Sequence, residues 1–386
     1  MRRGRRSPPR ESAAAPTASW AAPGIRVSEA RLEDVGARGG GGWVLRHLHL
    51  DLRPGELCAL LGPAGAGKST VLRVLAGFAG ADEGRVTIDG EDVAGVPPWR
   101  RNVGLVVSPA ALWPHLTVRE HLELGLRARG QRGAELRRTA DEGLALLGLE
   151  RLAARRPAEL AGDQPLRVAL ARALAVRPRL LLLDDVLADL DAADRAGMRA
   201  ELERLHRAVG ITTLCAMRDG GAALALATRV AVLDGGALVQ EGRPEDVYWR
   251  PRTRVVAELA GAASVLPVTV VELREVGVVA ETAGGARVPV ASGGHPWRLG
   301  ARAWLCLRPE ALGLEEAERA RGGIPGTVVR YAFEGGRARY EIAVPGGTVR
   351  VETATSPVQG RGFQRDDRVK LEIAPESSVL VPADPA

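Results

Sequence analysis

The segment GPAGAGKST at residues 62–70 combines three glycines, a lysine and two hydroxyl residues in one short stretch. The spacing satisfies G-x-x-x-x-G-K-[ST], a loop whose backbone N–H groups bind phosphate oxygens. Glycine suits this loop because no Cβ blocks the approach of the phosphate. Lys68 would place a positive charge at the β- and γ-phosphates, and the Ser69 hydroxyl would bind Mg²⁺. The predicted phosphate site comprises Gly62, Pro63, Ala64, Gly65, Ala66, Gly67, Lys68, Ser69 and Thr70.

Two adjacent acids, Asp184 and Asp185, end the apolar run RLLLLDD. If this run is a strand beside the phosphate loop, Asp184 lies at the carboxyl edge of the sheet and faces the nucleotide. It would then hold Mg²⁺ together with Ser69, directly or through water. An aspartate at a strand end can also simply cap or turn the chain. The phosphate loop favours the magnesium interpretation.

Strand-like and helix-like segments alternate around these residues. VLRHLHLDL, ELCALLG, RVTIDG and RNVGLVV precede the acids, and GITTLCAM and RVAVLDGG follow them. Uninterrupted apolar runs of this kind suit parallel strands that are covered on both faces. A helix is expected from about Ser69 to Ala76, directly after the phosphate loop. The Leu-, Ala- and Arg-rich segment 118–174 is mostly 3.6-periodic and predicts a helical subdomain inserted into an α/β core.

The pattern of predicted secondary structure changes after about residue 255. Short β-rich segments such as VLPVTVVEL, RAWLCLRPE and DDRVKLEIAP are separated by Gly and Pro. This pattern predicts a separate antiparallel, barrel-like domain at 255–386, following an α/β domain at 25–254. Residues 1–24 are rich in Arg, Pro, Ala and Ser, and we expect a disordered basic tail there, with contact to a membrane surface as the alternative.

The composition excludes several classes of protein. The chain has 386 residues, and its 53 Lys and Arg against 47 Asp and Glu give a net charge of +6 spread along the sequence. A diffuse excess of this kind indicates a solvated surface rather than a nucleic-acid site. Cys58, Cys215 and Cys306 lie far apart and form no C-x-x-C, which fits a reducing cytosol. No apolar run reaches the roughly 18 residues of a membrane span, so we expect a soluble, unexported chain.

From about Ile25 to Val381 the sequence resembles the ATP-binding subunits of ABC transporters. The branch it resembles is the importer branch that carries a C-terminal TOBE domain, including the ATPases for polyamine, ferric iron, sulfate, phosphonate and sugar uptake. The resemblance is carried by the phosphate loop and by ELAGDQPLRVALARALAVRPRLLLLDDVLADLD and ITTLCAMRDGGAALALATRVAVLDGG, with WLCLRPEALGL resembling a TOBE segment. It implies a P-loop NTPase fold of the ABC type followed by a small OB-like β-barrel, with ATP and Mg²⁺ as ligands.

Several positions that act on the γ-phosphate depart from the family pattern. Ser108 stands in place of the Q-loop glutamine, and its hydroxyl is too short for the same contacts with Mg²⁺ and water. In place of the signature LSGGQ the chain has Leu160 followed by Ala161, Gly162, Asp163 and Gln164. Ala161 removes the serine hydroxyl, and Asp163 places a carboxylate beside the nucleotide of the opposite subunit. The alternative for Asp163 is that it turns away and caps the helix that Pro165 begins.

Two further changes affect the reaction itself. Asp185 stands where the family has its glutamate base, and it is one methylene, about 1.5 Å, shorter. Arg218 corresponds to the switch histidine, but a guanidinium only donates and cannot accept a proton. Val186 replaces the usual proline, whereas Asp191 of the D-loop is kept. The resemblance therefore implies a site with Ser108, Asp185 and Arg218 at catalytic positions that binds Mg-ATP and hydrolyses it poorly.

Other candidate residues have an alternative in ordinary packing. In the segment GARGGGGWVL before the phosphate loop, Trp43 is the one aromatic that could stack on adenine, and a β-surface role is the alternative. Trp113 lies where the family's membrane subunit docks, and it might equally pack internally. His47 and His49 alternate on one strand face without a third ligand nearby, so we interpret them as strand histidines rather than a metal site.

The resemblance implies an importer subunit that works as a dimer, of two copies or with a second ATPase, at the cytoplasmic face of the membrane. Its partners would be permease subunits and, indirectly, an extracytoplasmic solute-binding protein, with no nucleic acid. A regulatory subunit that binds ATP without turnover is the first alternative. An ABC-type ATPase acting on DNA or ribosomes is the second. Tandem cassettes or a long coiled-coil insertion would mark that class, and neither is in the sequence.

Overall fold

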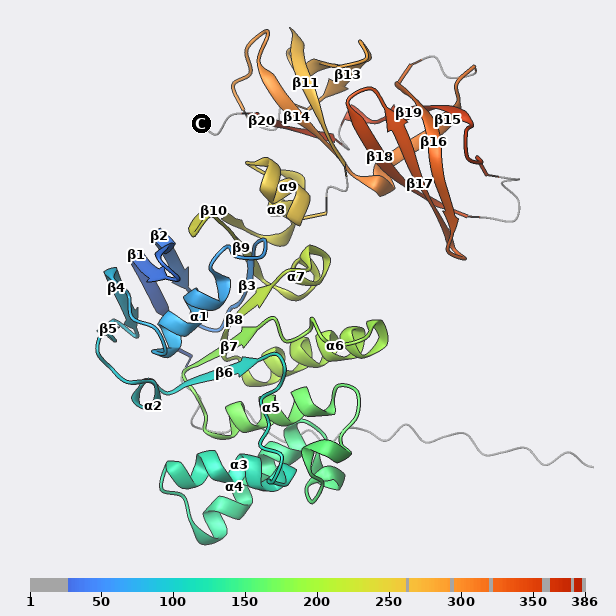
Figure 1. The fold of residues 1–386 in the computed structure, drawn as a ribbon. Helices are drawn as coiled ribbons and strands as arrows, with labels where there is room; N and C mark the ends of the chain where they lie inside the picture. The colour runs from blue at the N-terminus through green and yellow to red at the C-terminus, as the bar shows by residue number, and fades with distance from the viewer. Residues whose placement is uncertain are drawn as a thin grey trace, which may run out of the picture.

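The computed structural model of the chain describes residues 27–261, 264–291, 295–318, 322–355, 362–375 and 378–383. The predicted basic tail at 1–24 and the predicted start of the α/β domain at residue 25 lie outside the described residues. The described chain forms an α/β body and an all-β body, and two short helices, α8 (Pro244–Trp249) and α9 (Arg254–Leu259), lie between them (Figure 1).

The α/β body is built on a six-stranded sheet with the order β10-β9-β3-β8-β7-β6. The five strands from β9 to β6 are parallel, and β10 is antiparallel to β9. The strands are β3 (Leu57–Leu61), β6 (Val103–Val107), β7 (Leu180–Asp184), β8 (Thr212–Met217), β9 (Arg229–Asp234) and β10 (Ala237–Gly242). This confirms the predicted parallel sheet, and every residue of β3 and β8 is buried.

The sheet separates two apolar cores. Leu181 and Leu183 of β7 join one core with helices of the chain, whereas Leu180 and Leu182 join the other. Successive side chains of a strand point to opposite faces, so the unbroken leucine run supplies both cores. The helices of the first core are α3 (Val118–Ala128), α4 (Gly133–Leu146), α5 (Gln164–Ala175), α6 (Ala192–Val209) and α7 (Gly220–Leu226).

The second core lies under α1 (Lys68–Ala76) and a smaller antiparallel sheet of order β2-β1-β4-β5. That sheet comprises β1 (Ala30–Gly39), β2 (Gly42–Leu52), β4 (Glu83–Ile88) and β5 (Glu91–Asp92), and the short helix α2 (Pro98–Arg101) follows it. The helix expected at 69–76 is confirmed, with its first residue at Lys68.

Helices α3, α4 and most of α5 occupy the interval 118–174. Thr117 begins α3 with a capping box, in which its hydroxyl accepts from the Glu120 N–H and the Glu120 carboxylate accepts from the Thr117 N–H. The helices pack closely, because an added Cβ on Gly143 of α4 would lie 2.9 Å from Leu122 Cδ2 of α3. Short 3₁₀ turns at Glu150–Leu152 and Pro157–Glu159 lead to α5. This group lies at the end of the α/β body far from the all-β body (Figure 1).

The all-β body, called the β domain below, contains two five-stranded antiparallel sheets of order β13-β12-β11-β14-β20 and β15-β19-β16-β17-β18. Both sheets contribute to one apolar core, which confirms the predicted antiparallel domain. Its elements are β11 (Ser264–Leu273), β12 (Val278–Thr282), β13 (Arg287–Val290), β14 (Arg302–Leu307), η3 (Pro309–Ala311), β15 (Leu312–Glu316), β16 (Ile324–Phe333), β17 (Arg337–Val344), β18 (Gly347–Ala354), β19 (Arg368–Ile373) and β20 (Ser378–Pro382).

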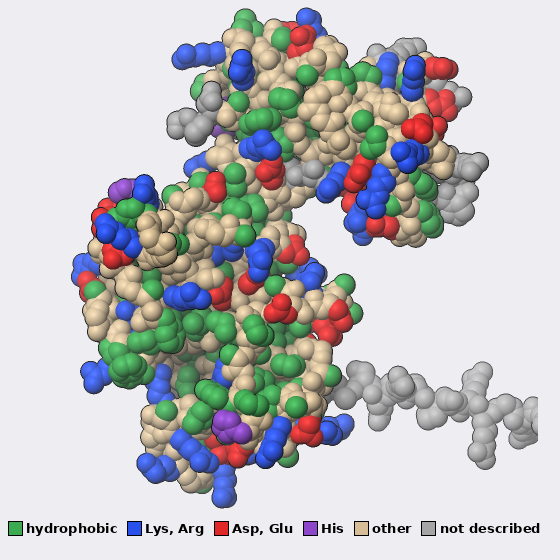
Figure 2. Space-filling model, in the orientation of Figure 1, with side chains coloured by type: hydrophobic (Ala, Val, Ile, Leu, Met, Phe, Trp, Pro, Cys, Tyr) green, Lys and Arg blue, Asp and Glu red, His purple; other side chains and the backbone are tan. Residues whose placement is uncertain are grey.

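Helix α9 begins one residue before the predicted domain boundary at 254/255, and its Ala257 packs with Cys306 and Val381 of the β domain. Lys and Arg side chains are interspersed with Asp and Glu over the visible face, as expected for a solvated surface (Figure 2). Among the described residues, the structure has no helix that is both long and apolar enough to cross a membrane.

Candidate nucleotide site

The phosphate loop connects β3 to α1 at the carboxyl edge of the parallel sheet. Gly65 and Gly67 have φ values of 81° and 99°, in the left-handed region that favours glycine. Gly62 is constrained by space, because an added Cβ would lie 2.4 Å from the Leu233 carbonyl oxygen. Gly67 precedes α1 and makes no side-chain cap, so the first N–H groups of the helix remain available to an anion.

Lys68 lies inside this loop. Its Nζ donates to the carbonyl oxygens of Gly62 at 2.6 Å and Pro63 at 2.8 Å, and the residue is only 8% exposed. Burial lowers the pKa of Lys68, and the nearby Arg218 lowers it further, whereas Asp185 and Asp184 oppose the shift. Burial disfavours the charged form of Lys68, and an anion bound by the loop would stabilise that charged form.

Ser69 and Asp184 lie together, as the sequence predicted. The Ser69 hydroxyl donates to Asp184 Oδ1 at 2.8 Å. Asp184 is the last residue of β7, and the parallel register places it beside Val107 of β6 and Ala216 of β8. A hydroxyl and a carboxylate are oxygen ligands of the type that Mg²⁺ prefers. The donor set therefore fits a magnesium ion next to the phosphate loop.

Asp185 and Arg218 form an ion pair at the same edge of the sheet. Arg218 Nε donates to Asp185 Oδ2 at 2.5 Å, and the Asp185 side chain is 22% exposed. β7 and β8 are neighbouring parallel strands, so the residues that follow them meet at their carboxyl ends. Asp185 has a φ of 53° and its N–H donates to the Ala216 carbonyl. The residue at the family's base position is thus already engaged by a permanent cation.

Ser108 has a partner that the sequence analysis missed. Its hydroxyl donates to the carboxylate of Asp189, and its backbone N–H donates to the Asp184 carbonyl at 3.3 Å. Both residues follow strands that are adjacent in the sheet, so only the strand order brings them together. The short side chain is held by the D-loop segment.

The four residues at the signature position, Ala161 to Gln164, lie at the start of α5. The Ala161 N–H donates to Gln164 Oε1 at 3.1 Å, and an added Cβ on Gly162 would lie 2.7 Å from Asp194 Oδ2. Asp163 is the residue before α5, but its side chain makes no capping hydrogen bond. The capping interpretation of Asp163 is therefore wrong.

The Asp163 carboxylate accepts instead from Arg167 Nε at 2.8 Å, one helical turn further along α5. A second acid, Glu201 of α6, lies 3.5 Å from the other side of the same guanidinium. The long Arg167 side chain, on the surface that α5 turns toward α6, competes with the helix N–H groups for this carboxylate. The D-x-x-x-R spacing is the sequence signal that could have identified the ion pair.

Asp191 in the D-loop has a structural role in the described chain. Its Oδ1 accepts from the Asp194 N–H at 2.8 Å and caps α6. Arg195, which the sequence analysis missed, donates to the Leu187 and Leu190 carbonyls from the first turn of that helix. Together these contacts fix the loop that follows Asp185.

Trp43 and Trp113 both carry an arginine on the ring. The Arg38 and Arg46 guanidinium carbons lie 4.5 Å and 5.9 Å from the centroid of the Trp43 ring on β2, and adenine stacking on this ring stays a prediction. Trp113 is 42% exposed, and the Arg172 guanidinium lies 5.0 Å from its ring centroid. Each ring is thus part of a cation–π contact within the chain.

The strand histidines also have an internal partner. His47 Nδ1 lies 2.8 Å and His49 Nε2 lies 3.7 Å from Asp34 Oδ1. The described residues contain no group of three His, Cys, Asp or Glu side chains able to hold a metal ion.

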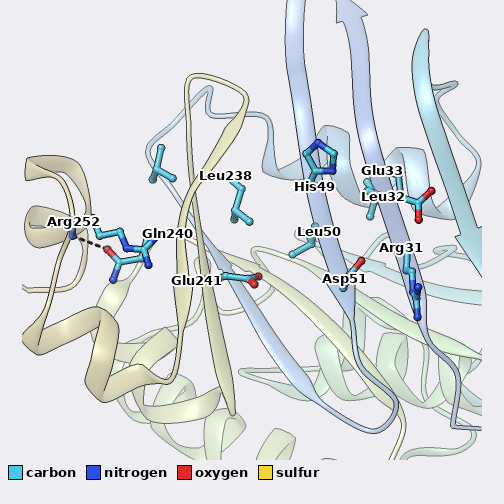
Figure 3. Close-up of a pocket in the computed structure, with 11 residues that line it drawn as sticks. Arg31, Leu32, Glu33, His49, Leu50, Asp51, Leu238, Gln240, Glu241 and Arg252 are labelled. Atoms are coloured by element: carbon cyan, nitrogen blue, oxygen red, sulfur yellow. Dashed lines mark hydrogen bonds between the residues drawn. The ribbon is translucent and has the colours of Figure 1, made fainter. Parts of the chain in front are cut away.

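Two pockets lie on the α/β body, and one of them adjoins the candidate site. A pocket of about 420 Å³ between β2 and β10 is lined by polar and apolar residues and includes none of the predicted site residues (Figure 3). A second pocket of about 270 Å³ is bounded by Asp185, Arg218 and Arg195, with Val186 and Met217 as apolar lining. Only the second adjoins the candidate site.

Known families match both bodies of the chain. The ABC transporter family matches residues 45–188, and the TOBE domain matches residues 305–381. The spermidine/putrescine import ATP-binding protein PotA of Frankia alni is 40% identical over 361 residues, covering 91% of this chain and 78% of that protein. The Fe(3+) ions import ATP-binding protein FbpC of Brucella abortus is 38% identical over 318 residues, covering 82% of this chain and 88% of that protein.

Solved structures match the α/β body. The ATP-binding cassette MJ0796, a dimer in a post-hydrolysis state with ADP and Pi, has a TM-score of 0.50 and 30% identity, covering 56% of this chain and 98% of that one. The cbiO1 protein of Clostridium perfringens has a TM-score of 0.53 and 25% identity, covering 56% of this chain and 89% of that one. The chain belongs to the ATP-binding subunits of ABC transporters, in the importer branch that carries a TOBE domain.

Proposed function

We propose that this chain binds Mg-ATP and hydrolyses it slowly as the subunit that drives import through membrane permease subunits. The observation that carries the proposal is the arrangement of Lys68 inside the phosphate loop beside the Ser69–Asp184 pair. The phosphate loop, Lys68 and the Ser69–Asp184 pair lie at one edge of the sheet, which supports binding of the phosphates and magnesium. The groups that turnover requires are altered at the same edge.

Binding would rest mainly on fixed groups. The loop N–H groups and the start of α1 would bind phosphate oxygens, and Lys68 would shift from the loop carbonyls to the β- and γ-phosphates. Magnesium held by Ser69 and Asp184 would neutralise part of the phosphate charge. The loop N–H groups and the start of α1 need little rearrangement, which favours affinity.

Hydrolysis would be limited by the ion pair of Asp185 and Arg218. A general base must approach its water within about 2.6–3.2 Å, and one Asp185 oxygen is already bound by Arg218 Nε. Arg218 can stabilise negative charge but cannot accept a hydrogen bond from water. A misplacement of about 1 Å can reduce a rate roughly a hundredfold, so the shorter Asp185 adds to this effect.

The proposed assembly is a dimer of ATP-binding subunits, of two copies or with a second ATPase, bound to permeases at the cytoplasmic face of the membrane. The dimeric cassette and the import relatives support it. An extracytoplasmic solute-binding protein would deliver the solute to the permeases. The same relatives favour import over a purely regulatory subunit.

The two relatives carry solutes of very different chemistry. PotA is named for spermidine and putrescine and FbpC for Fe(3+), yet both are nearly equally similar to this chain. The similarity of the ATP-binding subunit therefore does not follow the solute. We infer that the permease and binding-protein partners select it.

Calorimetric titration of the purified full chain with Mg-ATP tests the proposal. Lys68→Ala should weaken binding at least about a hundredfold, because it removes a charge-assisted contact inside a low-dielectric loop. Lys370→Ala, a lysine change in the β domain, is the matched control and should bind as the parent does. Addition of EDTA should weaken ATP binding in the parent.

Phosphate release by the same preparation tests slow turnover. Typical enzymes turn over at roughly 1 to 10³ per second. The expected rate is at least about tenfold below the lower end of this range. Equal affinity of the parent and Lys68→Ala would contradict the nucleotide assignment. Rapid phosphate release would show that the altered positions are compatible with catalysis.

A further inference from the structure

The joint between the two domains centres on Arg308, which follows β14 in the β domain. The residue is only 1% exposed, and its guanidinium carbon lies 3.9 Å from the centroid of the Tyr248 ring in α8. Its Nη2 donates to the Tyr248 carbonyl, and its Nη1 donates to the Ala257 carbonyl in α9 at 3.3 Å. The Tyr248 hydroxyl donates in turn to the Glu310 carboxylate. One arginine of the β domain thus holds two helices.

The two carbonyls belong to the last turns of α8 and α9. Such carbonyls lack partners within the helix and carry the negative end of the helix dipole. A guanidinium placed there satisfies both helix ends with one group. Ala257 also packs with Cys306 and Val381, so α9 is fixed to the β domain by apolar contact as well.

The same C-terminal end of α9 touches the start of α7, at the nucleotide-site edge of the sheet. An added Cβ on Gly220, the first residue of α7, would lie 1.7 Å from the Leu259 carbonyl oxygen and 3.5 Å from Ala260 Cα. The backbones therefore meet with no space for a side chain. Asp219 caps α7 by accepting from the Ala222 N–H at 3.1 Å, and Arg218 directly precedes it. A shift of α9 must move the residues that hold Arg218.

We propose that Arg308 is a positioning residue for the nucleotide site. It fixes α9, the end of α9 sets the position of Gly220 and Asp219, and these set the Arg218–Asp185 pair. Close-packed backbone contacts transmit displacements because they cannot be compressed. The inference rests on the proposed function, since the Arg218 cation is taken to act on the phosphates of bound ATP.

A double-mutant cycle in the full chain tests this role. Arg308→Met removes the charge and donors while keeping most of the volume. It should weaken Mg-ATP binding about threefold to tenfold in the parent, the range expected for coupled neighbours. In an Arg218→Ala background the same change should have no further effect. Arg330→Met, an exposed arginine on β16 of the same domain, is the control and should leave the affinity unchanged.

Gly220→Ala tests the same contact from the other side and keeps the proposal testable if Arg308→Met does not fold. It should weaken binding to a similar extent, again only when Arg218 is present. Unchanged affinity in the foldable variants would overturn the proposal. Equal losses with and without Arg218 would also overturn it, because they would indicate general destabilisation.

Hydrogen exchange gives a readout that does not depend on ATP. Arg308→Met should speed exchange in the peptide that contains the Ala222 and Ala223 N–H groups at the start of α7. If the parent binds no nucleotide, the proposed function fails, and this measurement still decides the positioning role. Faster exchange at α7 with unchanged exchange at α3 would support it, and unchanged exchange at α7 would overturn it.

Discussion

The phosphate loop and the strand-end groups around Asp185 belong to one site but have been altered to very different extents. The loop keeps each residue type that its chemistry requires, and its glycines occupy positions where a Cβ would strain or clash. Around Asp185, by contrast, an aspartate and an arginine stand at the positions where the resemblance places the family's glutamate base and switch histidine. The loop follows β3 and Asp185 follows β7, and both lie at the carboxyl edge of the same sheet with β8 between them.

The difference shows that binding and turnover make separate demands on a sequence. Binding uses backbone N–H groups that stay in place once the loop is folded, and one lysine that only has to turn from the loop carbonyls to the phosphates. Turnover needs a base, a water and a hydrogen-bond acceptor aligned within tenths of an ångström. A site can therefore lose the second ability while it retains the first.

The largest expected effect comes from restoring the altered region. The combination Asp185→Glu, Arg218→His and Ser108→Gln should raise ATP turnover at least about tenfold, because it restores reach, a proton acceptor and the Q-loop amide. Ala161→Ser and Asp163→Gly, added to the same chain, should raise it further if the active form is a dimer. Steady-state phosphate release at saturating Mg-ATP measures both steps.

The control for this restoration is Lys68→Ala in the same background, which should return turnover to the baseline. A restored chain that binds Mg-ATP as the parent does and remains equally slow would contradict the assignment of Asp185 and Arg218 as the limiting groups. The slow turnover would then need a cause outside Asp185 and Arg218.

A smaller effect should appear in the pH dependence of binding. Burial lowers the pKa of Lys68 in the free chain, and a bound phosphate should raise it again. ATP affinity is then fully present below the free-state pKa and falls as pH rises through it, with proton uptake on binding in that window. The decline should begin below the ordinary lysine value of 10.5.

Titration in two buffers of different ionisation enthalpy, repeated from pH 7 to higher pH, measures the affinity and the proton uptake together. Lys68→Arg is the matched comparison, because a guanidinium stays charged and its affinity should not fall over this range. The unliganded chain should also gain stability as pH rises and Lys68 loses its proton, which denaturant unfolding can check. An affinity that increases with pH would contradict this sign.

The sequence was sufficient for features that depend on local pattern. The strand, loop and helix around Lys68, the leucine run that ends at Asp184 and the antiparallel β domain all follow from apolar periodicity and glycine placement. The Ser69–Asp184 contact could be predicted because parallel strands end at one edge of the sheet.

Hydrogen bonds and ion pairs for which several partners are available could not be predicted from the sequence. Asp163 does not cap α5 as the alternative proposed, and its ion pair with Arg167 was not predicted. The pairing of Ser108 with Asp189 and the burial of Arg308 need the order of strands and the docking of the β domain. Neither the strand order nor the docking of the β domain can be inferred from the residues that flank Ser108 and Arg308 in the sequence.

The smallest expected effect concerns Asp163. The Asp163 side chain is 20% exposed and the Arg167 side chain 25% exposed. Their ion pair balances the charge of the Asp163 carboxylate within the chain. Asp163→Asn should therefore lower the unfolding free energy by only about 0.3–0.5 kcal/mol, the contribution of an i,i+4 ion pair on a helix.

ATP-dependent dimerisation distinguishes the two roles of this residue. If Arg167 neutralises Asp163, the Asn variant should dimerise with Mg-ATP within about twofold of the parent in analytical ultracentrifugation, since a balanced charge repels a phosphate only weakly. A gain of tenfold or more would mean that the carboxylate faces the opposite subunit's nucleotide. Arg167→Met, which leaves the same carboxylate without its ion pair, should then weaken dimerisation. The two variants change the dimerisation affinity in opposite directions only if the charge at this position acts on ATP.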